Sequence, residues 1–381
     1  MSDRIVTESG ERSGFIGVSD GKITDIGDDV SGFSGDCRVL DFRGRIIAPG
    51  LIELHSHGGG GHSFSDSDPS AVAAACDFHL SHGTTTILPT VTAGPFGRMA
   101  ESARNIRVVM EGKMTRANVA GVHMEGPYLS KKQAGAQCPA YITLPDEREY
   151  LPFLDELGPA VKRWDFAPEN DPEGKFTREL VSRGIIASAG HTDATYAQMR
   201  PALREGLSLV THLYSCTSTV TRDHGFRSPG VIETAFLLDG LYAEIIADGR
   251  HLPPEMIKMI VKIKGRERVA LITDSLAIAG TDVTSGTMSG TDFIVEDGVC
   301  KLTDRSAFAG SVATSDRLLR VLVHDCGISL ADAVYMASTT PADIIGLREK
   351  GRIEVGADAD FTVFTDALTV DSVFVAGKKA V

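Results

Sequence analysis

The sequence predicts an α/β protein: a (β/α)8 barrel of the TIM type with a small β-sandwich domain built from both ends of the chain. Three observations lead to this prediction. Short apolar segments alternate with helical segments over about 220–250 residues, the length that an eight-stranded barrel takes. Segments typical of β-strands lie outside this alternation, at both ends of the chain. Polar residues follow most of the apolar segments, where a barrel carries its active site.

The two ends of the chain are predicted to form one small domain, residues 1–50 with 348–381, beside a barrel of residues 51–347. Neither end alone has enough strands to bury a core, so we expect them to pair. A doubly wound open sheet is the competing architecture, but no G-x-G-x-x-G follows an early strand. The expected strands are Phe15–Val18, Lys22–Ile26, Arg38–Phe42, Asp360–Phe364 and Val370–Val375.

The central region alternates strands and helices whose ends carry recognisable signals, such as Asp68 before a helix and Gly265 after one. The expected barrel strands are Leu51–His57, Thr84–Pro89, Val119–Met124, Asp165–Pro168, Ile185–Ala189, Leu207–His212, Tyr242–Ala247 and Val269–Thr273. The expected helices are Pro69–His82, Arg98–Glu111, Glu173–Arg183, Thr195–Glu205, Val231–Leu238, Pro254–Lys264, Ser311–Asp325 and Ser329–Leu347.

Composition narrows the classes of partner. The 381 residues are 42% hydrophobic and 23% charged, with a net charge of −13 and no block of Lys or Arg. We therefore expect neither nucleic acid nor an anionic membrane as a partner. The six cysteines are scattered without a C-x-x-C pair, and the chain shows no signal peptide and no apolar run long enough to span a bilayer. These features predict reduced thiols and a cytoplasmic protein.

The stretch at residues 47–61, IAPGLIELHSHGGGG, ends an apolar run with His55 and His57. Residues two apart on a strand point to the same face, so both imidazoles are expected to project together from the strand end. Imidazole is the commonest protein ligand of zinc and similar metals. The alternative interpretation is that both histidines are ordinary polar residues where a strand ends.

Later strand ends decide between these interpretations. Glu125 follows the third strand (VHMEGP), His191 the fifth (SAGHT), and Asp274 the eighth (LITDS), and His212 ends the sixth (THLYS). Asp248 and His251 follow the seventh strand (IIADGRH). One such residue is weak support for a metal site, but the coincidence at matched positions favours one.

The mixture of imidazole and carboxylate suits a hard or borderline divalent metal. Glu125, His191 and His212 are expected to form one three-ligand site with a position open to water, and His55, His57 and Asp274 a second. A bound metal lowers the pKa of its water to about 7, which suits hydrolysis of amides or esters. Asp274 is then the expected acid and base.

The motifs HSHGGGG, HMEGPYLSKKQAGAQ, AGHTDATY, THLYS, IIADGRH, LITDSLAIAG and FAGS occur in this order, followed by KGRIEVGADADFTVF near the C-terminus. From about Ile46 to Phe364 the chain resembles the N-acetylglucosamine-6-phosphate deacetylase family of the amidohydrolase superfamily. HMEGP and IIADG-x-H are the most specific of these motifs.

The resemblance implies roles for individual residues. Glu125, His191 and His212 match the family's principal metal ligands, His55 and His57 match the first-metal pair of the superfamily, and Asp274 matches the catalytic acid and base. One or two divalent metals per subunit are implied, with zinc expected before iron, cobalt or manganese. The fourth strand, WDFAPEN, offers no lysine of the kind that two other branches carboxylate, which supports Glu125 as the carboxylate ligand.

The resemblance also implies a site for an amino-sugar phosphate. The matching positions are Ala136, Gln137, Ser215, Cys216, the Asp248–His251 loop, Phe308, Ala309 and Gly310. The family commonly has His where Gln137 stands and Asn-Ala where Ser215 and Cys216 stand. A phosphate-binding Arg is expected from the segment CTSTVTRDHGFRSPG, with Arg222 and Arg227 as candidates. In the family this Arg serves the neighbouring subunit's site, which implies a homodimer or higher homo-oligomer.

The sequence therefore predicts a metal-dependent hydrolase that converts N-acetylglucosamine 6-phosphate to glucosamine 6-phosphate and acetate. One alternative keeps the mechanism but changes the substrate to another N-acyl amino sugar (another epimer or an unphosphorylated one), an N-acyl amino acid or a cyclic amide. A second alternative is a non-catalytic binding protein that keeps the barrel, which the complete set of six polar residues disfavours.

Overall fold

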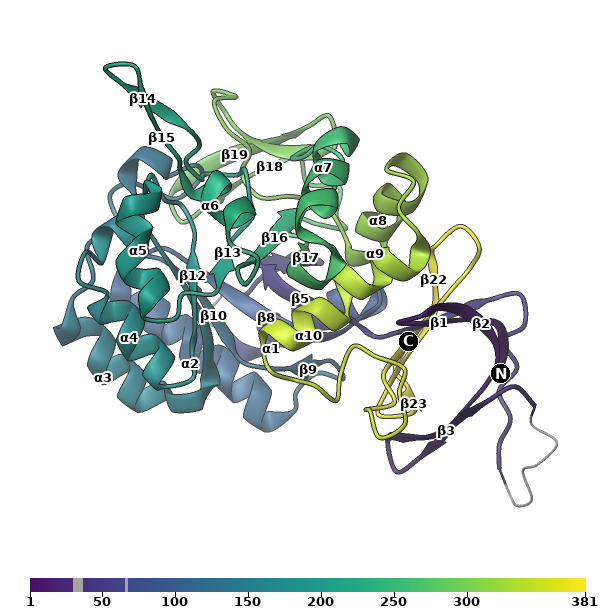
Figure 1. Ribbon diagram of the computed structural model, residues 1–381. Helices are drawn as coiled ribbons and strands as arrows, with labels where there is room; N and C mark the ends of the chain where they lie inside the picture. The colour runs from purple at the N-terminus through teal and green to yellow at the C-terminus, as the bar shows by residue number, and fades with distance from the viewer. Residues whose placement is uncertain (30–36, 66–67) are drawn as a thin grey trace.

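The computed structural model describes residues 1–29, 37–65 and 68–381, and Figure 1 shows a strand-and-helix barrel beside a sheet formed by the two ends of the chain. The predicted fold class is confirmed. The division at residues 50/51 and 347/348 stays a prediction, and residues 30–36 of its N-terminal part lie outside the described residues.

Eight parallel strands form the barrel in the order β17-β16-β13-β12-β11-β10-β8-β5. The last strand returns to the first, since β17 contacts β5 and the backbone N–H of Asp274 donates to the carbonyl of His55 at 2.9 Å. The strands are β5 (Leu51–Ser56), β8 (Thr84–Thr92), β10 (Val122–Glu125), β11 (Val161–Phe166), β12 (Ile186–Ala189), β13 (Leu209–Val210), β16 (Tyr242–Ile246) and β17 (Val269–Ile272), with β9 (Asn118–Val119) beside β8.

Helices cover the outside of the barrel (Figure 1). They are α1 (Pro69–Ser81), α2 (Phe96–Gly112), α3 (Glu147–Leu157), α4 (Lys175–Ser182), α5 (Tyr196–Arg204), α6 (Val231–Leu237), α7 (Pro254–Lys264), α8 (Ser315–Arg320), α9 (Leu330–Ala337) and α10 (Thr339–Ile344). Local signals explain several ends: the Asp68 side chain accepts from the Ser70 N–H before α1, and Thr195 and Gln198 form a capping box on α5.

Two helical regions differ from the expectation. Helix α3 was not expected; Asp146 caps it through the Arg148 N–H, but Pro152 interrupts the helical pattern of its sequence. The single helix expected over Ser329–Leu347 is two helices, because the chain leaves helical geometry at Ser338 (φ −138°, ψ −65°). Pro341 lacks an N–H, so it is tolerated in the first turn of α10 but would disrupt a continuous helix.

The ends of the chain form a seven-stranded sheet in the order β23-β22-β21-β4-β1-β2-β3. The strands are β1 (Ser2–Thr7), β2 (Gly10–Ser19), β3 (Lys22–Gly27), β4 (Ile46–Pro49), β21 (Phe361–Phe364), β22 (Val370–Val375) and β23 (Lys378–Lys379). The expectation of a strand at Arg38–Phe42 is wrong. β1 pairs with β2 on one side and with β4 on the other, so β1 has no free edge to which residues 38–42 could add.

Shorter strands follow the barrel strands at their C-terminal ends. They are β6 (Gly58–Gly59) with β7 (His62–Ser63), β14 (Thr221–Asp223) with β15 (Phe226–Ser228), and the three-stranded sheet β18 (Ser285–Met288), β19 (Thr291–Glu296) and β20 (Val299–Leu302). Across the described part of the chain, no helix combines the length and apolarity needed to cross a membrane.

A charged network fills part of the barrel interior. The Arg163 guanidinium donates to Asp165 through Nε (2.9 Å), to Thr211 Oγ1 through Nη2 (2.9 Å), and to both carboxylate oxygens of Glu244. Arg163, Asp165 and Glu244 are all fully buried. Because burying a charge is costly, the network is stable only while every charge keeps its partner.

We predict that Arg163→Leu lowers the free energy of unfolding by about 3–5 kcal/mol, because two buried carboxylates then lose their cation. Urea denaturation of the purified protein measures this loss. Arg148→Ala is the control, since Arg148 pairs with Asp146 on the surface. An Arg163→Leu midpoint equal to that of the control would contradict the assigned role.

Candidate functional site

Four histidines surround the carboxylate of Glu125, which ends β10. His191 Nε2 lies 3.1 Å and His212 Nε2 3.3 Å from Glu125 Oε1. His55 Nε2 lies 3.3 Å from Oε1, and His57 Nε2 lies 3.3 Å from Oε2. All five side chains are buried. The barrel therefore brings together residues that are up to 157 positions apart in the sequence (212 − 55).

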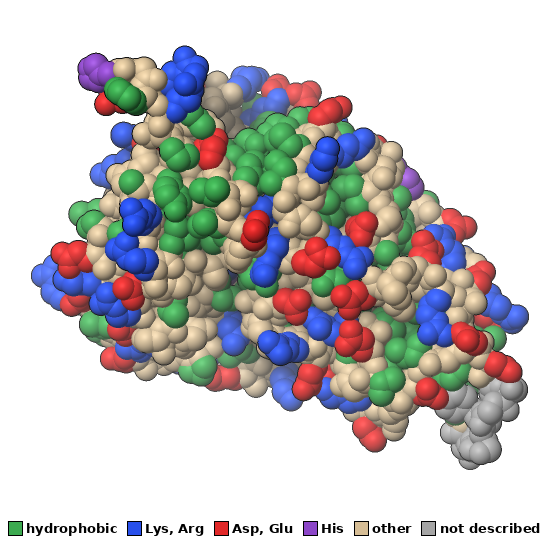
Figure 2. All heavy atoms as spheres, viewed as in Figure 1, with side chains coloured by type: hydrophobic (Ala, Val, Ile, Leu, Met, Phe, Trp, Pro, Cys, Tyr) green, Lys and Arg blue, Asp and Glu red, His purple; other side chains and the backbone are tan. Residues whose placement is uncertain are grey.

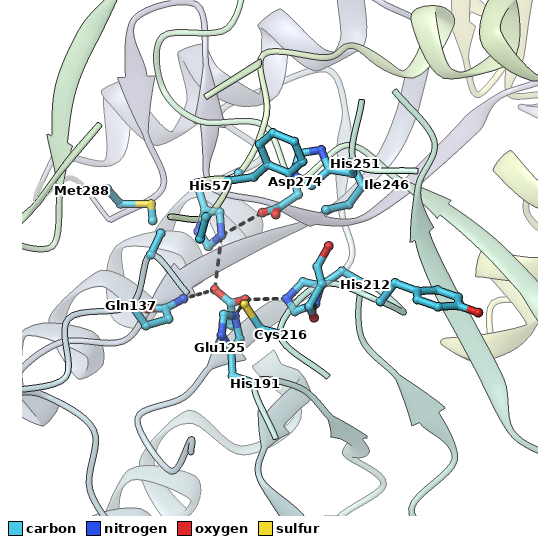
Figure 3. Close-up of a pocket in the computed structure, with 16 residues that line it drawn as sticks. His57, Glu125, Gln137, His191, His212, Cys216, Ile246, His251, Asp274 and Met288 are labelled. Atoms are coloured by element: carbon cyan, nitrogen blue, oxygen red, sulfur yellow. Dashed lines mark hydrogen bonds and ion pairs between the residues drawn. The ribbon is translucent and has the colours of Figure 1, made fainter. Parts of the chain in front are cut away.

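Asp274 completes the cluster from the end of β17. Its Oδ1 lies 3.1 Å from His57 Nε2 and 3.5 Å from His55 Nε2. All six residues predicted as metal ligands thus converge at one end of the barrel, as Figure 3 shows for five of them.

Hydrogen bonds to the other ring nitrogen orient three of the histidines. His57 Nδ1 contacts Thr92 Oγ1 at 2.8 Å, His191 Nδ1 the Gln133 carbonyl at 2.9 Å, and His212 Nδ1 the Ser215 carbonyl at 3.0 Å. A carbonyl can only accept, so His191 and His212 carry their proton on Nδ1 or on both nitrogens. In each case Nε2 is directed toward the carboxylates, the arrangement in which metal-binding imidazoles are usually held.

The donor set fits a divalent metal. Both ring nitrogens of His55 are buried without a hydrogen-bond partner among the described residues. Buried polar atoms normally have a partner, so these atoms indicate one from outside the chain. Two sets of ligand atoms lie close enough to hold an ion, His55–His57–Asp274 and His55–Glu125–His212.

A further set, His55–His123–Asp165, lies deeper in the barrel. Asp165 is already paired with the buried Arg163 and with His123 Nε2 at 3.0 Å. A cation placed there would face the guanidinium at close range, so we do not assign a metal to this set.

The site is electrostatically coupled. Burial alone would raise the pKa of Glu125, but the surrounding histidines, His55 and His57 foremost, hold it well below its ordinary value. Burial would lower the pKa of His57, but Glu125 and Asp274 raise it to about 10. The pKa of Asp274 is lowered, since His55 and His57 outweigh its burial. Both carboxyl groups are therefore ionised at neutral pH and attract a cation.

Three of the cluster residues have left-handed backbone conformations that side chains other than Gly rarely adopt. The φ angles are +45° at His191, +28° at His212 and +51° at Asp274. Such strain concentrates at functional sites, where it sets the direction of a side chain. Here the turn that ends each strand directs the side chain over the barrel end.

A cavity of about 270 Å³ opens beside the cluster (Figure 3). Its lining includes seven of the residues predicted to bind substrate: Ala136, Gln137, Ser215, Cys216, His251, Phe308 and Gly310. Asp248, Ala309, Arg222 and Arg227 do not line it. Four further lining residues were not expected from the sequence: Tyr214, Ile246, Met288 and Ala307.

Gln137 and Asp248 form hydrogen bonds with other residues of the site. Gln137 Nε2 donates to Glu125 Oε2 at 2.6 Å, which leaves its buried Oε1 without a partner. Asp248 accepts from His251 Nδ1 at 2.9 Å and from the His251 backbone N–H at 2.8 Å. Asp248 therefore fixes the His251 ring, which lies against Phe308 with ring centroids 4.7 Å apart.

The two candidate arginines lie on the β14–β15 hairpin, where Arg222 pairs with Arg227 in the antiparallel register. Both are exposed, and Figures 1 and 2 show the hairpin standing away from the body of the molecule. Within the described residues, no Lys or Arg lines the cavity. A phosphate bound there would need a cation from elsewhere.

The comparisons with known proteins agree with this geometry. The model of the amidohydrolase family matches residues 46–380. The chain is 32% identical to the N-acetylglucosamine-6-phosphate deacetylase of Bacillus subtilis (strain 168), with 94% of this chain and 91% of that protein covered. It is 30% identical to the N-acetylgalactosamine-6-phosphate deacetylase of Shewanella sp. (strain ANA-3), with 95% and 90% covered.

One solved structure combines a similar fold with a bound substrate. It is a mutant N-acetyl-D-glucosamine-6-phosphate deacetylase of Mycobacterium smegmatis in complex with N-acetyl-D-glucosamine-6-phosphate. Its TM-score is 0.91 at 29% identity, and the match covers 100% of this chain and 98% of that one.

We predict that Glu125→Gln loses metal, because the variant removes the charge that contacts all four imidazoles. The loss of affinity should exceed the roughly 10- to 100-fold that changing an outer partner of a ligand costs. Elemental analysis after purification without chelator measures it. His82→Asn is the control, since His82 pairs with Asp316 outside the cluster; equal metal content in both variants would refute the assignment.

Proposed function

The chain belongs to the amidohydrolase family, and from that premise we propose that it deacetylates N-acetylglucosamine 6-phosphate to glucosamine 6-phosphate and acetate. The observation that carries this proposal is the buried cluster of four imidazoles and two carboxylates, open to a cavity of about 270 Å³. Relatives named for this reaction cover most of the chain at 30–32% identity.

We propose that Glu125, His191 and His212 hold one divalent metal, and that His55, His57 and Asp274 hold a second where two are bound. Zinc fits imidazole and carboxylate ligands, as do iron, cobalt and manganese. When bound, such a metal polarises the acetyl carbonyl and makes water more acidic.

Asp274 is the proposed acid and base. It is ionised and buried at the centre of the cluster, where it can accept a proton from the attacking water. The same carboxyl group then gives that proton to the amine nitrogen as the C–N bond breaks. The neighbouring imidazoles of His55 and His57 hold its oxygen toward the centre of the cluster.

The residues proposed to bind the sugar line the cavity: Ala136, Gln137, Ser215, Cys216, His251, Phe308 and Gly310. Asp248 would act by orienting His251, and Ala309 by placing its neighbours. For the phosphate we propose Arg222 or Arg227 of a second copy of the chain. This requires a homodimer or higher homo-oligomer, and it supplies a cation, which the described residues of the cavity lining do not.

A second candidate substrate is the 4-epimer, N-acetylgalactosamine 6-phosphate. The relative from Shewanella that is named for this epimer is 30% identical over 95% of the chain, close to the values for the glucosamine enzymes. Three residues of the lining, Gln137, Ser215 and Cys216, stand where the family commonly has other residues.

We also propose that the protein is cytoplasmic. All six cysteines lack a disulfide partner, two of them at exposed or partly exposed positions outside the cavity, Cys37 and Cys138. Such thiols persist in a reducing compartment.

Acetate release by metal-replete enzyme tests the proposed reaction. Rapid turnover of N-acetylglucosamine 6-phosphate is expected, with less from its 4-epimer and from unphosphorylated N-acetylglucosamine. Turnover of the epimer alone would make N-acetylgalactosamine 6-phosphate the first candidate substrate. Equal kcat/KM with and without phosphate would refute the proposed phosphate site.

Asp274→Asn is predicted to lower kcat by about 100- to 10,000-fold, because the amide cannot carry the proton. Circular dichroism and metal analysis of the variant should show a folded protein with metal still bound by Glu125, His191 and His212. Near-normal turnover by this folded, metal-containing variant would rule out the role given to Asp274.

A mixing experiment tests whether the arginine acts across subunits. The Arg222→Ala/Arg227→Ala double variant should lose roughly 30-fold or more in kcat/KM, as expected when a phosphate loses its charged partner. Co-expressed with Asp274→Asn, it forms heterodimers in which one site has both an intact Asp274 and an arginine from its partner. Activity should return in these heterodimers, and its absence would show that the arginine acts within its own subunit.

A further inference from the structure

Glu169 holds the turn that presents His191 at the end of β12. It lies in the short 3-10 helix η4 (Pro168–Asn170), which follows β11. Its Oε2 accepts from the Thr192 hydroxyl at 2.6 Å, and its Oε1 accepts from the Asp193 backbone N–H at 2.7 Å. Both carboxylate oxygens of Glu169 therefore bind the two residues that directly follow His191.

The backbone at His191 needs such support. Its φ of +45° is a conformation that residues other than Gly keep only where the surrounding contacts fix it. The His191 carbonyl accepts from the Ser130 N–H at 2.8 Å, which fixes the peptide group on one side of the strained residue. Beyond that peptide group, Glu169 fixes the chain.

A second path of hydrogen bonds returns from Glu169 to the imidazole. Asp193, whose N–H binds Glu169, also accepts from Gln133 Nε2 through Oδ1 at 3.1 Å. The Gln133 carbonyl in turn accepts from His191 Nδ1 at 2.9 Å. The backbone of His191 and its ring are thus held by one closed set of hydrogen bonds that includes Glu169.

Thr192 extends this support to the turn that carries His212. The Thr192 N–H donates to the carbonyl of Cys216 at 3.0 Å, and its own carbonyl accepts from the Ser218 N–H at 3.1 Å. Thr192 is fully buried, and its hydroxyl binds Glu169. Contacts from Glu169 therefore reach the turns of both imidazoles.

We infer that Glu169 is a positioning residue, which fixes His191, and through Thr192 the turn of His212, in the orientation that binds the metal. The inference rests on the metal site proposed above. Glu169 does not line the cavity, so it acts on the imidazoles through the backbone and not on the substrate.

The expected consequence of losing Glu169 is weaker metal binding. Changing an outer partner of a metal ligand typically costs about 10- to 100-fold in metal affinity, because the imidazole is no longer held in one orientation. The ligands themselves remain, so excess metal should restore kcat. KM should stay near the wild-type value, because no substrate contact is removed.

Competition with a chromophoric chelator measures the zinc dissociation constant without relying on turnover. Glu169→Ala should raise it by about 10- to 100-fold. Glu233→Ala is the matched control, since the Glu233 carboxylate also accepts from a Thr hydroxyl (Thr219, 2.8 Å) and a backbone N–H (Gly230, 2.8 Å). It stabilises the start of α6 instead of a ligand turn, so its dissociation constant should match the wild type.

Two further variants test the contact itself. Glu169→Gln keeps one acceptor oxygen and should weaken zinc binding less than Glu169→Ala. Thr192→Val removes the hydroxyl that Glu169 accepts from. Its effect on the zinc dissociation constant should be smaller in the Glu169→Ala background than in the wild type, because the partner is already gone.

The outcomes separate this inference from the proposed function. Wild-type zinc affinity in folded Glu169→Ala or, if that variant does not fold, in Glu169→Gln would overturn the positioning role and leave the deacetylase intact. An equal loss of affinity in Glu233→Ala would do the same. A wild-type protein that binds no metal at all would overturn both.

Discussion

The structure of the site depends on one buried carboxylate. Glu125 is 1% exposed, and a carboxylate in that position is costly unless positive charge or hydrogen-bond donors surround it. Four imidazoles meet that requirement, each within 3.3 Å of a Glu125 oxygen. One lies on β5, one directly after it, and the other two lie in the turns after β12 and β13. Strands that are distant in the sequence must therefore end at the same height in the barrel.

Beneath this centre, the barrel interior is charged as well. Arg163 balances Asp165 and Glu244, and Asp165 contacts His123, whose ring lies 4.6 Å from that of His55. The interior thus supports the site with fixed charges rather than with aliphatic packing alone. A network in which every member is paired is rigid, which keeps His55 and Glu125 in position above it.

The alternation of strands and helices, and the ligands at the strand ends, could be predicted from the sequence because each depends on local pattern. The strand expected at Arg38–Phe42 does not form. Its residues have β propensity, but β1 already occupies the edge beside β4. The β propensity of a segment does not show whether another strand already occupies the sheet edge that it would join. Helix α3 was missed because Pro152 interrupts its pattern, although in the structure Asp146 caps the helix through the Arg148 N–H.

Some residues that line the cavity could not be predicted from the sequence around them. Met288 reaches the cavity from the β18–β20 sheet, and nothing near it in the sequence marks it. Ile246 lies in the IIADGRH motif at the end of β16, but only the polar residues of that motif were singled out. Arg222 and Arg227 were expected near the substrate, but they lie on an exposed hairpin whose position depends on the tertiary fold. The sequence thus predicts ligands better than it predicts the walls of the cavity.

The sheet built from both chain ends imposes an order on folding during synthesis. β4 precedes every barrel strand, yet one of its two neighbours, β21, is made after all of them. While the ribosome produces the barrel, the β4 edge that later pairs with Phe361–Phe364 has no partner. An open edge invites pairing with other chains, so the nascent protein is most prone to aggregate until its last strands emerge.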